Sequence, residues 1–270
     1  MTKIIQISDP HIVTKGELAY GQVDTCTALK KCVDKIKRIL PEIGPIDMII
    51  VTGDLTDFGK KEEYSLFREI VEELGIPYRA IPGNHDNKLA MHNAFADMDW
   101  MPINGPINWE LDFYDLKLIA LDTSITGIAH GNLESISLDF LRTSLSTANG
   151  RPVLVATHHP PIITGLEKMD IQNLRDSAEL KEILSAHTGE LKLICGHVHR
   201  NIVGQFGNKL CQIAPGVSHA VTMDLRIGAP NCLTKEPGSF LLHEIREGIL
   251  SHQILVDNYD GPFMFYPDSK

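Results

Sequence analysis

The stretch "LKLICGHVHR", residues 191–200, ends a run of apolar residues in a glycine and two histidines one residue apart. The apolar letters are typical of a buried strand, and Gly196 permits an unusual backbone dihedral where that strand stops. In extended backbone the side chains of His197 and His199 point the same way. A single pair of this kind is more often two surface or core histidines than a metal site. The choice depends on whether ligand-type residues also follow other strands.

Similar short apolar runs recur along the chain and alternate with helical patterns. The strand candidates are residues 3–8, 47–53, 78–83, 116–122, 152–158 and 191–197. Amphipathic helical patterns cover residues 24–40, 60–74, 137–147 and 176–187. Asp24 is a candidate N-cap of the first helix, Pro41 is its expected stop, and Gly75 closes the second helix. This alternation predicts an α/β fold, and the strand pattern alone predicts a single sheet.

The pattern changes after residue 200. Residues 208–216 are one more strand candidate, and residues 239–245 and 249–256 resemble the two strands of a hairpin joined through Arg246-Glu247-Gly248. Residues 223–238 are rich in glycine and proline, which indicates irregular structure.

Length and composition narrow the class of protein. The 270 residues fit one large domain, or a domain with a small addition, and the chain is 43% hydrophobic and 22% charged, as in ordinary globular proteins. The net charge of −10 argues against a nucleic-acid polymer as the main partner. No apolar run approaches the ~20 residues of a membrane span, and the first residues lack the pattern of a signal peptide. The five scattered cysteines have no CxxC spacing, so we expect reduced thiols and a cytoplasmic location.

Polar clusters follow five of the six main strand candidates. These clusters are Ser8-Asp9-Pro10-His11, Gly53-Asp54-Leu55-Thr56-Asp57, Gly83-Asn84-His85-Asp86, Thr157-His158-His159-Pro160-Pro161 and Gly196-His197-Val198-His199. In open α/β sheets, ligands bind beyond the carboxyl ends of the strands. One shared site explains the five clusters more simply than five separate structural reasons.

The donor atoms of these clusters are nitrogen and oxygen, without sulfur. Such a set suits Fe, Mn, Zn or Co, and it disfavours a structural zinc site, which often contains cysteine. There are too many candidate ligands for one ion. Two ions ~3.5–4 Å apart, bridged by a carboxylate, would use them all, and such sites clamp the oxygens of a phosphoryl displacement. The chain has no P-loop, so phosphate would be held by metal.

The five motifs carry a family resemblance. "DPH", "GDLTD", "GNHD", "HHPP" and "GHVH", in this order over residues 9–199, resemble the calcineurin-like metallophosphoesterase superfamily. "LAYGQVD", "LDTSITG", "PGVSHA" and the tail "NYDGPFMFYPD" are similar to the class III cyclic-nucleotide phosphodiesterases and their bacterial glycerophosphodiesterase relatives. The resemblance implies a four-layer αββα sandwich of two mixed sheets with helices outside.

The resemblance also implies a role for each motif residue. The first metal ion would be held by Asp9, His11 and His199, the second by Asn84, His158 and His197, and Asp54 would bridge the two. The family ligand in the histidine doublet lies two residues before proline, so His158 is preferred and His159 is expected to pack beside it.

Further residues are expected at the substrate. Asn84 and His85 would bind the phosphate, His85 would also protonate the leaving alkoxide, and Asp86 would orient His85. His219 and Tyr20 are expected to contact the substrate. Histidines outside the motifs are expected to be structural.

The predicted function is hydrolysis of small phosphodiesters, namely glycerophosphodiesters, 3′,5′-cyclic nucleotides or both, by attack of a metal-activated hydroxide. A phosphodiesterase specific for cyclic AMP is the alternative. A DNA-repair nuclease and a non-catalytic protein-binding scaffold, like the retromer-associated subunit of the superfamily, are more distant ones. Purple acid phosphatases carry a tyrosine ligand where this chain has Asp57, so a tyrosinate–iron site is not expected.

The chain is expected to divide into a catalytic domain, residues 1–222, and a C-terminal cap and oligomerisation segment, residues 223–270. The late hairpin has strand edges that could pair with another chain, and relatives use this region for dimer contacts. We therefore expect a homo-oligomer, at least a dimer. The alternative is that the segment only completes the sheet of its own chain.

Overall fold

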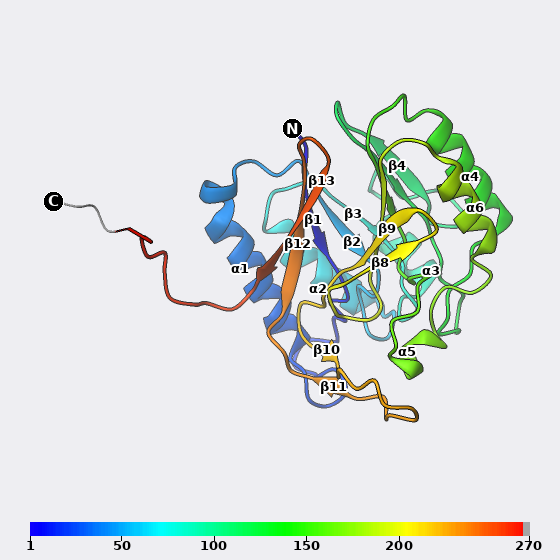
Figure 1. Cartoon of the computed structure of the whole chain (residues 1–270). Coiled ribbons are helices and arrows are strands. Elements are labelled where there is room, and N and C mark those ends of the chain that lie inside the picture. Colours follow the sequence, from blue (N-terminus) through cyan, green and yellow to red (C-terminus); the bar gives the residue numbers. More distant parts are fainter. Residues whose placement is uncertain (267–270) are drawn as a thin grey trace.

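The computed structural model of the chain describes residues 1–266 and shows two β-sheets that pack against each other between helices (Figure 1). The first sheet has five strands in the order β13-β12-β1-β2-β3. Its strands are β1 (Lys3–Ile7), β2 (Met48–Thr52), β3 (Tyr78–Ile81), β12 (Ser239–Ile245) and β13 (Ile249–Leu255). β1, β2 and β3 run parallel, so their carboxyl ends share one edge of the sheet.

The second sheet has six strands in the order β4-β5-β6-β7-β9-β8. Its strands are β4 (Trp109–Asp112), β5 (Lys117–Ala120), β6 (Val153–Ala156), β7 (Leu191–Cys195), β8 (Ile202–Phe206) and β9 (Lys209–Ile213). The four central strands are parallel, and β4 and β8 pair antiparallel at the two edges. A separate two-stranded ribbon consists of β10 (Ala220–Val221) and β11 (Leu233–Thr234).

Helices lie outside the two sheets, apart from the short α5 (Glu167–Asp170), which lies near β10 and β11 (Figure 1). The others are α1 (Thr25–Ile43), α2 (Lys61–Glu72), α3 (Lys88–Ala94), α4 (Ser135–Ser146) and α6 (Ala178–Ala186). In Figure 1, α1 lies beside the first sheet, and α4 and α6 lie on the far side of the second. No helix of the described residues combines the length and the apolar character that crossing a membrane requires.

The second sheet is apolar on both faces. Leu118 and Leu154 join the core cluster that fills the space between the sheets, whereas Ile119 and Val155 join the cluster under α4 and α6. Neighbouring residues of a strand point to opposite faces. Burial of both faces is the reason that these strands read as continuous apolar runs rather than alternating ones.

The four-layer fold implied by the family resemblance is confirmed, and the single sheet expected from the strand pattern alone is wrong. The pattern of apolar residues shows where a strand is, but it does not record which strands pair. The chain leaves the first sheet after β3 and starts the second at β4.

The ends of the first helix differ in how well they were predicted. Asp24 is its N-cap, as expected, and accepts a hydrogen bond from the backbone N–H of Thr27 at 2.9 Å. The stop expected at Pro41 is wrong, because the helix continues to Ile43 and ends at Gly44. A proline so near the end of a helix removes one backbone hydrogen bond without breaking the last turn.

The predicted late hairpin is confirmed as β12 and β13. It lies in the chain's own first sheet, where β12 pairs antiparallel with β1 and Ile5 is opposite Leu242. The hairpin thus completes the sheet of its own chain. After it, Asn258 and Tyr259 still contact Arg38 and Lys35 of α1, and residues 260–266 leave the body of the molecule (Figure 1). The division after residue 222 stays a prediction, and the last four residues of the predicted segment, 267–270, lie outside the described part.

Candidate metal centre

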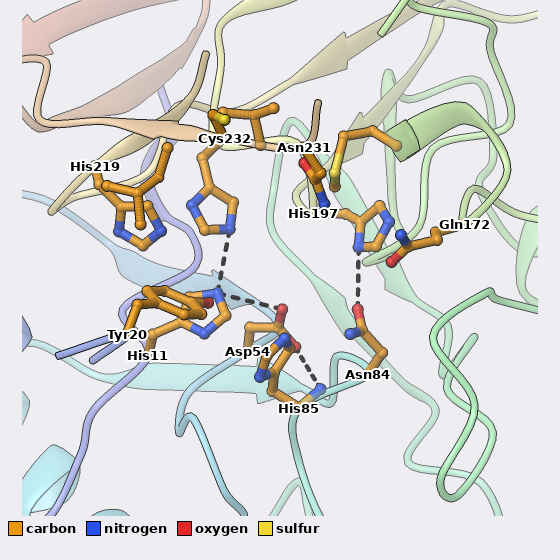
Figure 2. A pocket seen from close by; sticks show the side chains of 14 residues that line it. His11, Tyr20, Asp54, Asn84, His85, Gln172, His197, His219, Asn231 and Cys232 are labelled. Carbon is orange, nitrogen blue, oxygen red and sulfur yellow. Dashed lines mark hydrogen bonds and ion pairs between the residues drawn. The ribbon is translucent and has the colours of Figure 1, made fainter. Parts of the chain in front are cut away.

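The five motifs meet at one place, beyond the carboxyl ends of β1, β2, β3, β6 and β7, where His158 contacts both Asn84 and Asp54. Figure 2 shows residues of four of these motifs, His11, Asp54, Asn84 and His197, around one space. The residues that we name the ligand cluster are the seven predicted metal ligands, Asp9, His11, Asp54, Asn84, His158, His197 and His199. All but Asn84 are buried. The first sheet supplies the residues up to Asn84, and the second supplies the three histidines that follow.

The backbone of the cluster is strained. Positive φ angles occur at Asp9 (53°), His11 (46°), Asp54 (50°), His197 (75°) and His199 (55°). Residues other than glycine rarely adopt such angles, and strain of this kind tends to persist at functional sites. These residues follow β1, β2 and β7 in the chain, and their side chains contact one another in the ligand cluster.

One half of the cluster gathers around His11. Its Nε2 lies 3.1 Å from Nε2 of His199 and 3.4 Å from Oδ2 of Asp54. Nε2 of His199 in turn lies 3.5 Å from Oδ1 of Asp9. The structure therefore brings together the residues expected around the first metal ion.

The other half gathers around Oδ1 of Asn84. That oxygen lies 3.2 Å from Nε2 of His158 and 3.0 Å from Nδ1 of His197. Nε2 of His158 is 3.4 Å from Oδ2 of Asp54, the same carboxylate oxygen that approaches His11. Asp54 is thus shared by the two halves, in the position of a bridging ligand.

These separations fit metal coordination. Donors bound at about 2.1 Å to one ion, at the angles of tetrahedral or octahedral geometry, lie roughly 3.0–3.4 Å from one another. The distances in both halves of the cluster fall in or close to this range.

The imidazoles of the cluster differ in charge state. Burial opposes the charged form of His158, but the Asp54 carboxylate outweighs it and raises the pKa of His158 to about 9. Burial and the nearby His158 lower the pKa of His197 to about 3, and burial and His219 hold the pKa of His199 well below its usual range. A neutral imidazole has one ring nitrogen without a proton, which can bind a metal ion, so His197 and His199 are in the form that metal binding requires. The residues present fit a pair of metal ions.

Supporting contacts hold the ligands in place. Nδ1 of His158 lies 2.8 Å from the carbonyl oxygen of Thr52, and Asp9 accepts a hydrogen bond from the backbone N–H of His197 at 3.0 Å. Nδ1 of His11 lies 3.0 Å from Oδ1 of Asp57. Partners on the second ring nitrogen fix the orientation of a ligating histidine. The sequence analysis used Asp57 only to exclude a tyrosine metal ligand at that position, so its contact with His11 was missed.

His85 lines the cavity next to the cluster, with about a third of its side chain exposed (32%). Its backbone N–H donates to Oδ1 of Asp54 at 2.9 Å, and its Nδ1 lies 3.0 Å from the carbonyl oxygen of Asp57. Burial opposes the charged form, but the Asp54 and Asp57 carboxylates outweigh it and raise the pKa of His85 to about 10. The ring can therefore carry a proton beside the ligand cluster.

Asp86 does not contact the imidazole of His85, contrary to the expectation that it orients that ring. Its carboxylate accepts hydrogen bonds from the backbone N–H groups of Gly83 at 2.9 Å and Leu55 at 3.1 Å. It thereby joins the loop after β3 to the loop after β2. The ring of His85 is instead held by Asp57, whose carbonyl oxygen and Oδ1 lie 3.0 and 3.3 Å from its Nδ1, and it packs edge-on against the ring of His11.

Tyr20 and His219 lie together at the cavity, as expected of residues that meet a substrate (Figure 2). Their ring centroids are 5.4 Å apart, and that of His219 lies 4.5 Å from that of His199. His159 is fully buried, and its Nδ1 lies 2.8 Å from Oγ1 of Thr123. Its ring packs beside that of His158, with centroids 4.7 Å apart, and the choice of His158 as the ligand stays a prediction.

The cavity beside the cluster has a volume of about 270 Å³. Its wall includes residues that no motif indicated, Met169, Gln172, Val221, Asn231, Cys232 and Leu233. They come from the loop around α5 and from the ribbon of β10 and β11. Their patterns in the sequence are those of ordinary loops, so only the fold places them here.

Comparisons with known proteins agree with this geometry. Residues 2–201 match the sequence model of the calcineurin-like phosphoesterases. The chain is 38% identical to the probable glycerophosphodiester phosphodiesterase GpdQ of Arcobacter nitrofigilis, over 97% of this chain and 96% of that protein. It is 32% identical to the 3′,5′-cyclic adenosine monophosphate phosphodiesterase CpdA of Pseudomonas aeruginosa, over 80% of this chain and 79% of that protein. Its fold is similar to that of a dimetal phosphatase from Danio rerio, with a TM-score of 0.65 and 13% identity over 95% and 99% of the two chains.

Proposed function

Since the chain belongs to the calcineurin-like phosphoesterase family and is a metal-dependent phosphodiesterase, we propose that the ligand cluster holds its two metal ions and that the adjoining cavity binds a small phosphodiester. The observation that carries this proposal is the convergence of nitrogen and oxygen donors at 3.0 to 3.5 Å on both sides of Asp54. Asp9, His11 and His199 hold one ion, and Asn84, His158 and His197 hold the other.

When bound, two metal ions supply a water of lowered pKa and neutralise charge on the phosphoryl oxygens. The side chains of the protein donate the proton and position the substrate. His85 faces the cavity beside Asp54 with its Nδ1 held by Asp57, which supports a role in donating its proton to the leaving oxygen. Asn84 and His85 contact the phosphate, and Tyr20 and His219 form a side wall for one substituent.

The substrates are glycerophosphodiesters, cyclic nucleotides or both. The relative with the more extensive coverage is named for glycerophosphodiesters and another for cyclic AMP. The cavity of about 270 Å³ suits a small diester. A polymeric nucleic acid is disfavoured by the net charge of −10.

The metal pair is drawn from Fe, Mn, Zn and Co, because the donors are imidazole, carboxylate and amide groups without thiolate. Reconstitution of the metal-free protein with each metal, followed by assay on bis(p-nitrophenyl) phosphate, tests the activity and ranks the metals. Comparison of kcat/KM for glycerophosphoethanolamine and cyclic AMP at matched metal loading then ranks the substrates. A fully loaded protein that cleaves no phosphodiester would overturn the proposal and favour a protein-binding scaffold.

We also propose that the C-terminal segment, residues 223–270, covers the site and joins two copies of the chain. Its loop supplies cavity residues such as Cys232 and Leu233. Beyond the hairpin, the tail exposes large apolar side chains, Tyr259, Phe263, Met264, Phe265 and Tyr266. Apolar groups exposed together often mark a protein interface.

Truncation after Val256 keeps the hairpin and removes the tail. We expect the mass measured by light scattering to fall from that of a dimer or larger assembly to that of a monomer. A tail with Phe263 and Phe265 changed to serine is the matched control for chain length. An unchanged mass in both variants would contradict the role of the tail in assembly, and a monomeric wild type would contradict the assembly itself. A cytoplasmic location also stays a prediction, supported by five cysteines that form no disulfide.

A further inference from the structure

Two loops wall the cavity on the side of His197. One surrounds α5 and supplies Gln172, and the other connects β10 to β11 and supplies Asn231. Figure 2 shows the two amide side chains on either side of His197, at the edge of the ligand cluster. We name Gln172 and Asn231 the amide pair.

Gln172 is held with one polar atom free. Its Nε2 donates a hydrogen bond to the carbonyl oxygen of Lys168 at 2.9 Å, so Oε1 remains as an acceptor. The loop that carries it is well fixed. Asp170 accepts hydrogen bonds from the backbone N–H groups of Thr164 at 2.8 Å and Gly165 at 2.9 Å. A side chain whose loop is held by hydrogen bonds keeps one position, and it can therefore distinguish between ligands.

Asn231 sits on a loop that is tied to the first one. The backbone N–H of Gly228 donates to Oε2 of Glu167 at 2.7 Å, which joins the loop of Asn231 to α5. Behind Asn231, the ribbon pairs Val221 with Leu233. Asn231 is exposed at the rim of the cavity, and its side chain makes no hydrogen bond to another residue within 1–266, so its amide can reach a ligand that enters the cavity.

The charged residues of the cavity wall indicate which kind of group the amide pair binds. Among the described residues that line the cavity, Asp54 is the one carboxylate, and there is no lysine or arginine. A charged group away from the phosphate therefore has no ionic partner on the wall. Amide groups, which both donate and accept, match neutral hydroxyl groups.

We propose that the amide pair binds hydroxyl groups of the alcohol esterified to the phosphate, and that it selects polyol phosphodiesters over diesters of simple alcohols. This inference rests on the proposed function, because it assumes that the phosphate lies on the ligand cluster. It favours a glyceryl substituent, which carries two hydroxyl groups, over the single 2′-hydroxyl of a cyclic nucleotide.

Two synthetic substrates test the proposal, glyceryl p-nitrophenyl phosphate and propyl p-nitrophenyl phosphate. They share a leaving group and a carbon chain length and differ by two hydroxyl groups. We expect the metal-loaded enzyme to prefer the glyceryl ester by about tenfold in kcat/KM, since a site built for hydroxyl groups discriminates against analogues that lack them. Gln172→Met and Asn231→Leu remove hydrogen bonding with little change of size, and each should lower this preference about threefold or more.

Gln205→Met is the matched control, because Gln205 is exposed on β8 and outside the cavity. It should keep the full preference. A wild-type ratio near one, an unchanged ratio in both variants, or an equal loss on both esters would overturn the amide pair as a selective site. Hydrolysis of both esters in these cases would leave the proposed function standing. Failure of the loaded wild type to cleave either ester would defeat the proposed function itself, and the inference with it.

Discussion

Replacement of Gly83 by alanine should disable the centre through the bridging carboxylate. A Cβ atom at this position would lie 2.1 Å from Oδ1 of Asp54, 2.5 Å from its backbone nitrogen and 2.7 Å from its Cγ. Carbon atoms do not approach such atoms within 3.0 Å, so the carboxylate oxygen would have to move by at least 3.0 − 2.1 = 0.9 Å. Asp54 cannot yield easily, because it is buried and its φ of 50° is already strained.

The consequence can be estimated from this displacement. A misplacement of about 1 Å in a catalytic group can cost on the order of 100-fold in rate. Here the displaced group lies within 3.4 Å of both His11 and His158, so both halves of the cluster lose a ligand position. We expect Gly83→Ala to lower kcat/KM at least 100-fold and to reduce the bound metal below two ions. Overpacking should also cost about 1–3 kcal/mol of folding free energy.

The assay combines metal analysis by mass spectrometry, kcat/KM on bis(p-nitrophenyl) phosphate and thermal unfolding. Gly204→Ala on β8 is the matched control, because its Cβ would meet only the end of the flexible Ile162 side chain, at 3.0 Å. The reasoning is refuted if Gly83→Ala folds, retains two metal ions and keeps kcat/KM within threefold of the wild type.

Three further predictions follow from other contacts. Asp54→Ala should lose both metal ions rather than one, because its Oδ2 lies 3.4 Å from ligands of each half; a variant with two ions and full activity would contradict the bridging role. Asp57→Asn should lower kcat about 10- to 100-fold with little change in KM, since Asp57 holds the ring nitrogens of His11 and His85. The control Asp99→Asn removes an exposed ion pair with Arg79 and should change neither kcat nor KM. Burial and Lys192 lower the pKa of His243 to about 3, whereas an unfolded histidine has a pKa of about 6.5. Between about pH 6.5 and 3, therefore, His243 takes up a proton in the unfolded chain but not in the folded one. The folded state consequently loses stability as the pH drops below about 6.5. In urea unfolding, the free energy of unfolding should fall between pH 7 and pH 5 by about 2 kcal/mol less in His243→Gln than in the wild type or in the control His252→Gln. Equal losses in all three proteins would count against a neutral, buried His243.

The sequence alone was sufficient to find the candidate ligands. Each motif is local, because the ligand side chains follow directly on the last residues of a strand, and parallel strands bring their carboxyl ends to one edge. The buried central strands and the hairpin of β12 and β13 could be predicted for the same reason, since apolar periodicity depends on neighbours in the chain. The edge strands β4 and β8 and the short ribbon of β10 and β11 were not predicted. The family resemblance added the choice of His158 over His159 and the two-sheet architecture.

Only the tertiary structure decided how distant segments meet. It separated the strands into two sheets, because strand pairing depends on long-range packing that no local pattern records. It assigned the contact with His85 to Asp57 instead of Asp86, because backbone N–H groups of the neighbouring loops take up the Asp86 carboxylate. It also placed Gln172 and Asn231 at one cavity, although 59 residues, 231 − 172, separate them in the chain. Loop residues carry no periodic signal, so their position depends on the hydrogen bonds that fix each loop to the sheets and to the other loop.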